Sequence, residues 1–103
     1  MGMIQTLTSV SPTTETNIHT ATGDEAISSV RIVNDNASAV TINLSISTST
    51  ATQQASGKIL ADSFSIPADT AYTTDAFAMN TTNEFLVLYA SAAVSTIVTA
   101  WSE

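Results

Sequence analysis

Hydrophobic and polar residues alternate strictly from Val40 to Ile46. Every second position holds a branched aliphatic residue, and the positions between them hold Thr, Asn or Ser. A period of two residues places these two sets on opposite faces of an extended chain. The pattern therefore predicts a half-buried β-strand.

The same alternation recurs, less regularly, along most of the chain. It predicts further extended segments at residues 3–10, 18–20, 26–33, 60–66, 72–79 and 94–101. The continuous apolar run Phe85–Tyr89 is typical of a central strand that is covered on both faces.

Turn-forming residues separate these segments. Asn34, Asp35 and Asn36 tolerate left-handed backbone and bond their own main chain, so they predict a turn that joins two strands into a hairpin. Pro67 ends a ladder because it has no backbone N–H. Residues 47–57 contain no large hydrophobe and predict the end of a strand followed by an exposed loop.

Turn signals come about every ten residues, and no segment has a helical period. This spacing predicts an all-β fold, an antiparallel β-sandwich or jelly-roll-like arrangement of seven to eight strands. Residues 1–16 are expected to form an extended N-terminal arm and a linker, because Pro12 and small polar residues follow Val10. Residues 17–103 are expected to form a single β-sandwich domain.

Composition narrows the possible partners. The 103 residues include nine acids and two basic residues, which give a net charge of -7. Such a chain repels a phosphate backbone, so nucleic-acid binding is not expected. There are no cysteines for disulfides or thiolate metal sites. No apolar run approaches the length of a membrane span or a signal peptide. We therefore expect that the protein does not associate with a membrane and that it assembles in a cytoplasm.

Catalytic chemistry is poorly supplied. His19 is the single histidine and is expected to be a surface or interface residue of a strand. The acid pairs Asp24–Glu25 and Asp69/Asp75 have oxygen ligands for calcium, but lack the alternating spacing and glycine of a calcium loop. We therefore expect no enzymatic activity and no cofactor or metal.

Edge strands suggest where partners bind. Soluble β-proteins guard their edges with Lys, Pro or bulges, and this chain has one Lys and two Pro. We expect partner subunits, or the arm of a neighbouring copy, to cover the edges, and a homo-oligomer such as a trimer is one such arrangement. The candidate interface residues are Met3, Ile4, Leu7, Val10, His19 and Arg31. Trp101, near the end of the chain, is expected to cap the core.

Several segments together resemble a group of small virion proteins of tailed bacteriophages. The resemblance rests on Asn17-Ile18-His19-Thr20, Gly23, Ala26–Asn34, Val40-Thr41-Ile42, Ile66-Pro67-Ala68-Asp69-Thr70, Tyr89-Ala90-Ser91 and Glu103. It spans residues 17–103. This chain has His19 where that group usually has Tyr, and it lacks a proline before Gly23.

The resemblance implies a non-enzymatic β-sandwich located in a virion. Its expected role is that of a capsid decoration or cement protein, which stabilises the shell through many contacts with the major capsid protein or another virion protein. Two alternatives stay open: a structural subunit of the tail, neck or fibres, and a carbohydrate-binding or receptor-binding module.

Overall fold

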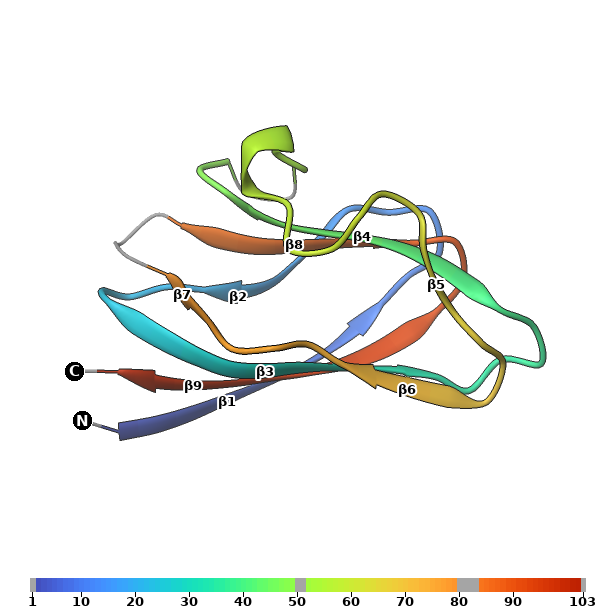
Figure 1. Ribbon diagram of the computed structural model, residues 1–103, viewed down its shortest axis with the longest axis horizontal. Coiled ribbons are helices and arrows are strands. Elements are labelled where there is room, and N and C mark those ends of the chain that lie inside the picture. The colour runs from blue at the N-terminus through green and yellow to red at the C-terminus, as the bar shows by residue number, and fades with distance from the viewer. Residues whose placement is uncertain (1, 50–51, 80–83, 103) are drawn as a thin grey trace.

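The computed structural model describes residues 2–49, 52–79 and 84–102. Two antiparallel β-sheets pack face to face in a body of 40 × 24 × 19 Å (Figure 1). The prediction of an all-β sandwich is confirmed. The described residues form nine strands, against the seven to eight expected.

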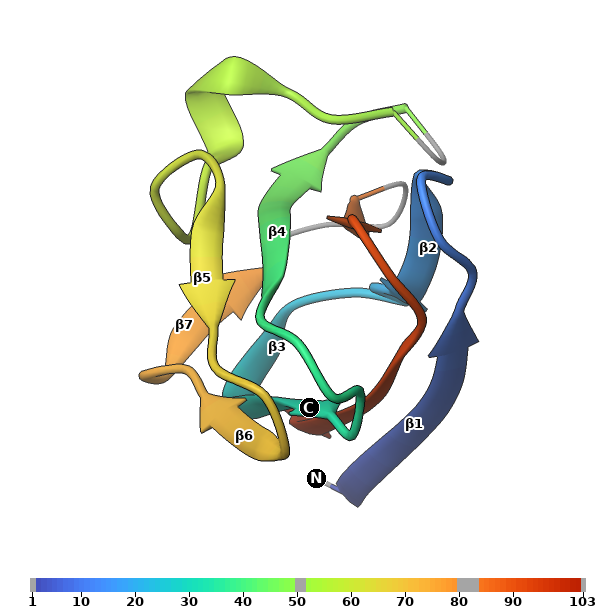
Figure 2. The same ribbon diagram turned by 90° about the vertical axis from the view of Figure 1, so that its right-hand side faces the viewer.

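The larger sheet, which we call sheet A, contains five strands. Its order is β1, β9, β3, and then β6 and β7, which pair with different parts of the same side of β3. The strands are β1 (Gly2–Val10), β9 (Val94–Ser102), β3 (Glu25–Asn34), β6 (Thr70–Thr73) and β7 (Phe77–Met79). Strand β1 is the edge strand on one side (Figure 2).

The smaller sheet, sheet B, contains four strands in the order β2, β8, β4, β5. They are β2 (Thr16–Thr20), β8 (Phe85–Ala90), β4 (Val40–Ser47) and β5 (Phe64–Ile66), and a short 3-10 turn, η1 (Ala55–Gly57), follows β4 in the chain. Strand β8 lies between β2 and β4, and three consecutive residues, Leu86, Val87 and Leu88, are buried. The prediction of a central strand covered on both faces is therefore confirmed.

The core lies between the two sheets. Most strands alternate, so the aliphatic half of their residues faces inward, whereas β8 is buried on both faces. The largest fully buried side chains are Ile18, Ile27, Ile32, Ile42, Leu44, Ile66, Met79, Leu86 and Leu88. Each contributes about 1.5–3 kcal/mol by burial, which is the main source of stability in a chain without disulfides.

The N-terminal segment differs from the expected arm. Strand β1 pairs with β9 without interruption from Gly2 to Val10, in antiparallel register with Ser102 to Val94. Its inward positions include the partly buried Ile4 and the fully buried Val10, which pack with the core. The expectation of a separate N-terminal arm was wrong for residues 2–10, because they form an edge strand of the sandwich itself.

The expected hairpin at Asn34 was also wrong. Strand β3 belongs to sheet A and β4 to sheet B, so the turn carries the chain from one sheet to the other. The side chain of Asn34 is fully buried and holds this crossing together. Its Nδ2 donates to the carbonyls of Ser38, Ile66 and Pro67 at 3.0–3.1 Å, and its Oδ1 accepts from the backbone N of Asn36 at 3.0 Å.

Candidate interface

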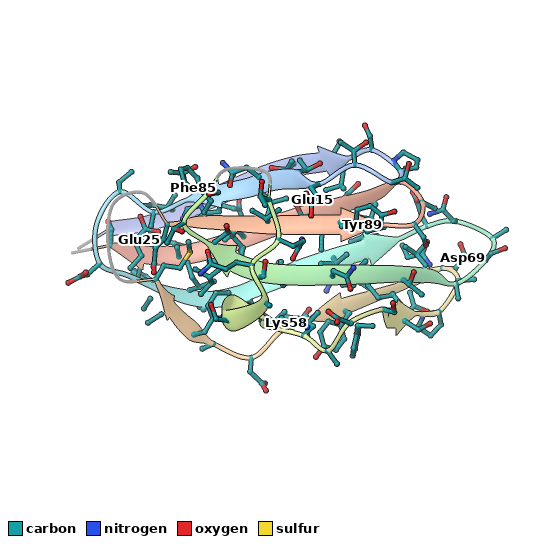
Figure 3. The ribbon with its side chains drawn as sticks, turned by 90° about the horizontal axis from the view of Figure 1, so that it is seen from above. Glu15, Glu25, Lys58, Asp69, Phe85 and Tyr89 are labelled. Carbon is teal, nitrogen blue, oxygen red and sulfur yellow. The ribbon has the colours of Figure 1, made fainter. Side chains whose placement is uncertain are left out.

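Charged side chains are almost absent from the strands. Sheet A contains only Arg31 and the buried Glu25, and sheet B contains none apart from the ionisable His19. The other described acids lie outside the strands, at Glu15, Asp24, Asp35, Asp62, Asp69, Asp75 and Glu84. Figure 3 places Glu25 and Asp69 near opposite ends of the sandwich and Lys58 on the side away from β1.

The outer face of sheet B is covered by the chain itself. Gln53, in the segment after β4, donates from Nε2 to the carbonyls of Asn43 and Val87 at 3.1 and 3.0 Å. Its Oε1 accepts from the Ser45 hydroxyl at 2.6 Å, and its backbone N donates to Glu15 at 3.1 Å. This segment and η1 lie over β4 and β8 (Figure 1). Residues 47–57 were expected to be the end of a strand followed by an exposed loop. Ser47 does end β4, and most of the described loop residues are exposed, but Gln53 and Gln54 contact the sheet.

The outer face of sheet A has no such cover among the described residues. All three large hydrophobics that are strongly exposed lie on it: Met3 is 61%, Leu7 69% and Trp101 41% exposed. Met3 pairs with Trp101 and Leu7 with Ile97, so these side chains form two rows across β1 and β9, and the polar pair Gln5 and Thr99 lies between the rows. The second row continues to Arg31 on β3. We call these five residues the apolar face.

A shallow hollow follows β1 and β9 at one end of this face. Its volume is about 260 Å³, and it is lined by Leu7, Thr8, Ser9, Ser95, Thr96 and Ile97. Its lining is uncharged. This shallow, uncharged hollow therefore suits an uncharged side chain or strand of a protein better than a charged ligand.

The predicted interface residues separate into two groups. Met3, Leu7 and Arg31 lie together on the outer face of sheet A. Ile4 and Val10 point to the core, and His19 is 5% exposed. Strand β1 alternates, so no single face presents all four of its predicted residues.

Sequence reasoning missed Trp101. The alternation places Ile97 and Trp101 on one face of β9 and Val94, Thr96 and Val98 on the other, but it does not tell which face is inner. The prediction that Trp101 caps the core was wrong, because the buried set is Val94, Thr96, Val98 and Ala100. The signal that identifies the inner face is the pairing of β9 with β3, which is not local in sequence.

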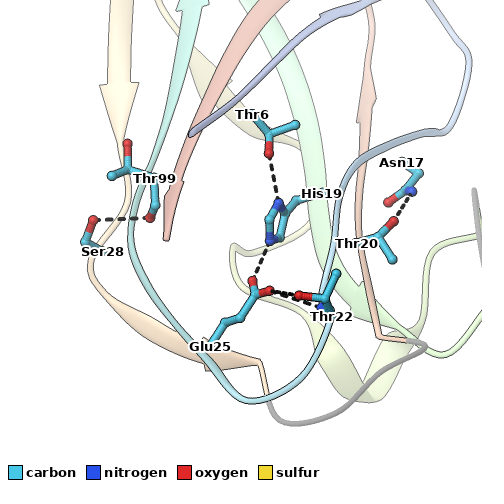
Figure 4. Close-up of polar contacts among 8 residues, drawn as sticks. All are labelled: Thr6, Asn17, His19, Thr20, Thr22, Glu25, Ser28 and Thr99. Atoms are coloured by element: carbon cyan, nitrogen blue, oxygen red, sulfur yellow. Dashed lines mark hydrogen bonds and ion pairs between the residues drawn. The ribbon is translucent and has the colours of Figure 1, made fainter. Parts of the chain in front are cut away.

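A buried polar row ties β1 to the opposite sheet (Figure 4). His19 on β2 contacts a polar side chain with each ring nitrogen. Its Nε2 is 2.6 Å from Oε1 of Glu25, and its Nδ1 is 3.0 Å from the hydroxyl oxygen of Thr6 on β1. The second oxygen of Glu25 accepts from the backbone N and hydroxyl of Thr22 at 3.0 and 3.1 Å. The row joins the edge strands of both sheets and the start of β3, and the expectation that His19 lies at the surface was wrong.

The Glu25 carboxyl has a lowered pKa. Burial raises the pKa of this carboxyl, but the hydrogen bonds from His19 and Thr22 and the charge of His19 together outweigh burial and hold it below 4.5. Glu25 is therefore ionised at neutral pH, and its Oε1 accepts a hydrogen bond from Nε2 of His19.

Hydroxyl, imidazole and carboxylate in a row also occur at nucleophilic active sites. Here the side chain of His19 is 4% exposed and that of Glu25 is 1% exposed. A substrate has little access to either group, and these burial values favour a role in holding β1 against β2. As for the calcium candidates, the described residues contain no group of three or more His, Cys, Asp or Glu side chains placed to hold a metal ion. Glu25 is engaged by His19 instead.

No helix in the described part of the chain is both long enough and apolar enough to span a membrane. Comparison with protein-family models, with curated proteins and with solved structures finds no significant match to this chain.

Proposed function

We propose that this protein is a non-enzymatic structural component of a bacteriophage particle, a decoration or cement protein that binds the major capsid protein or another shell protein. The observation that carries the proposal is the apolar face of sheet A. Its exposed residues, Met3, Leu7 and Trp101, have no cover from the described chain, whereas the opposite face of the sandwich has its own.

Large exposed side chains gathered on one face with few charges are typical of protein–protein interfaces. Trp and Arg are among the residues that most often dominate binding energy, and Trp101 and Arg31 both lie on this face, in rows separated by the row that contains Thr99. A shell offers the same binding surface many times, so modest contacts at each position raise the apparent affinity of a subunit that touches several. The location in a virion rests on the resemblance of residues 17–103 described above.

Protein quantification in purified particles of the phage that encodes the chain tests this function. Hundreds of copies per particle would support a shell component. A few to a dozen copies per particle would indicate a tail or neck subunit and contradict the decoration role. Absence of the chain from particles would overturn the virion role altogether.

A carbohydrate-binding role is the second candidate, and the exposure of Trp101 is the observation that favours it. An exposed indole ring can stack on a sugar face, but the other aromatic side chains are partly buried, and Tyr72 packs against Phe64 with ring centroids 4.6 Å apart. A glycan array probed with the full chain separates the two functions. Specific hits that Trp101→Ala abolishes would favour the carbohydrate role over the shell role.

A further inference from the structure

We infer that the free edge of β1 binds β1 of a second copy of this chain in antiparallel pairing, which joins the two five-stranded sheets into one continuous sheet. The inference goes beyond the virion role and does not depend on it. It starts from a comparison of the sheet edges.

Strand β1 is the longest and least protected edge. It runs for nine residues in unbroken register with β9, and it contains no proline, no charged residue and no bulge. A strand edge of this kind exposes a row of unpaired N–H and C=O groups that can pair with another strand.

The other edges of the two sheets are shorter and interrupted. Strand β5 has three residues and is followed directly by Pro67. Strands β6 and β7 have four and three residues, and Asp75 lies in the connection between them. Strand β2 has five residues with a register shift between Asn17 and His19. Only β1 offers a long regular template among the described strands.

Charge favours a second copy at this edge. Each chain carries a net charge of -7, so two copies repel one another at most orientations. The strands of sheet A that lie next to the edge, β1 and β9, contain no charged residue among those described. Figure 2 shows β1 on the side of the molecule opposite β5, β6 and β7, the side where Asp62 and Asp75 are located. The approach of two β1 edges therefore brings uncharged surfaces together and keeps these acids apart.

Symmetry makes the pairing self-complementary. Antiparallel pairing about a two-fold axis uses the same strand from both copies, as in other isologous interfaces. When the whole strand is used, Thr6 lies at the axis and Gln5 faces Leu7 of the second copy. The two Leu7 side chains then become diagonal neighbours on the outer face, at about 7–8 Å between backbone positions. The exposed Leu7 thus gains an apolar contact, and the apolar face continues across the axis with two copies of Trp101 and Arg31.

The buried polar row supports this edge from behind. The Thr6 side chain points inward to His19, so the middle of β1 is held in place before any second copy arrives. A template that is already ordered loses less conformational entropy on pairing than a flexible arm does.

The test measures the association of the full chain by sedimentation velocity across the micromolar range. We expect a reversible dimer, and we expect added NaCl to strengthen it, because salt screens the repulsion between two acidic molecules. A monomer throughout this range would overturn the inference. Weakening by salt would overturn it too, because it would mean that contacts between opposite charges hold the copies together.

The variant Leu7→Lys should weaken the dimer by about tenfold or more, because it places like charges beside each other at the axis. Thr73→Lys is the matched control, since Thr73 lies exposed on the same face at the far edge of sheet A. Mixing Leu7→Lys with Leu7→Glu should restore association as a heterodimer. Equal dimerisation of Leu7→Lys and wild type would exclude β1 as the interface.

Hydrogen exchange on the unchanged protein gives a second readout that needs no variant. Amides along the free edge of β1 should become more protected as the concentration rises, while those of β5 should not change. Concentration-dependent protection at β5 in place of β1 would overturn the assignment of the edge.

Discussion

Single residues determine how the sandwich is held together at its ends. Glu25 and Asn34 lie at the two ends of β3, both are buried, and both have every polar side-chain atom satisfied. Glu25 anchors His19 and Thr22, whereas Asn34 bonds three carbonyls across the crossing between the sheets. Buried polar groups of this kind are costly to disrupt, because each loss leaves partners unsatisfied.

The lowered pKa of Glu25 predicts a loss of stability in acid. The unfolded chain binds a proton near pH 4.5 and the folded chain only at lower pH, so the free energy of unfolding falls as pH drops through this interval. Glu25→Gln should lower that free energy at pH 7 by about 1.5–3 kcal/mol, and its deficit should shrink toward pH 3. Urea denaturation at both pH values checks this.

The matched control for Glu25→Gln is Asp24→Asn, which changes net charge equally at an exposed neighbour. A deficit of equal size in Glu25→Gln at pH 7 and pH 3 would show that the ionised form of Glu25 contributes nothing to stability.

Asn34→Ala should be strongly destabilising. It leaves the carbonyls of Ser38, Ile66 and Pro67 without their donor and removes the acceptor for Asn36, so we expect a loss of about 2–4 kcal/mol. Chemical denaturation followed by circular dichroism measures it. Asp35→Ala, at the exposed neighbouring position of the same turn, is the comparison and should change stability little. Similar losses in both variants would argue against Asn34 as the organiser of the crossing.

At the scale of elements, the segment after β4 explains why the two outer faces differ. It reaches over sheet B, bonds β4 and β8 through Gln53, and approaches β4 most closely at η1. Gly57 has no space for a side chain there, because a Cβ would overlap the carbonyl oxygen of Ile46. The small residues of this segment, which indicated a loop, are those that allow it to lie flat on a sheet.

Gly57→Ala should therefore detach or shift this segment, with a loss of about 2 kcal/mol or more, because the clash is with backbone and not with a flexible side chain. Thermal unfolding measures the loss. Gly23→Ala is the natural control, since a Cβ at Gly23 meets no atom within 4 Å. A Gly57→Ala variant as stable as Gly23→Ala would show that the approach is looser than described.

At the scale of the whole molecule, the fold determines where charged side chains and exposed hydrophobic side chains lie. Apart from Arg31 and Glu25, the described charges lie outside the strands. One outer face is covered in part, and the other presents Trp101 near its end and Arg31 on β3. The protein has the properties of a building block whose exposed face and free edge are on the same sheet. A dimer through β1 would double the apolar face that we propose binds the shell.

In a binding experiment with phage particles made without this protein, Trp101→Ala should weaken binding of the added chain by about tenfold or more. The reason is that exposed Trp residues at interfaces are frequent hot spots. Its thermal stability should change little, because the ring is 41% exposed. Tyr89→Ala, an aromatic change on sheet B, is the matched control (Figure 3). Unchanged particle binding of Trp101→Ala in a pull-down would remove the apolar face from the proposed function.

The all-β class, most of the strands and the central position of Phe85–Tyr89 could be predicted from the amino-acid sequence, because a two-residue period and its turn signals are local properties of the chain. The same period leaves each strand with two equivalent choices of inner face. It separated Ile97 and Trp101 from Val98, for example, and the assignment of Trp101 to the core rested instead on the expectation that a terminal strand is held down by a buried side chain.

Long-range pairing resolves that choice. The register of β9 with β1 and β3 turns Trp101 outward, the membership of β3 and β4 in different sheets replaces the expected hairpin, and the meeting of Thr6, His19 and Glu25 buries the single histidine. These outcomes depend on residues far apart in the chain that meet only after folding. Local patterning therefore specifies strands, whereas burial between two sheets specifies which side chains are left to bind a partner.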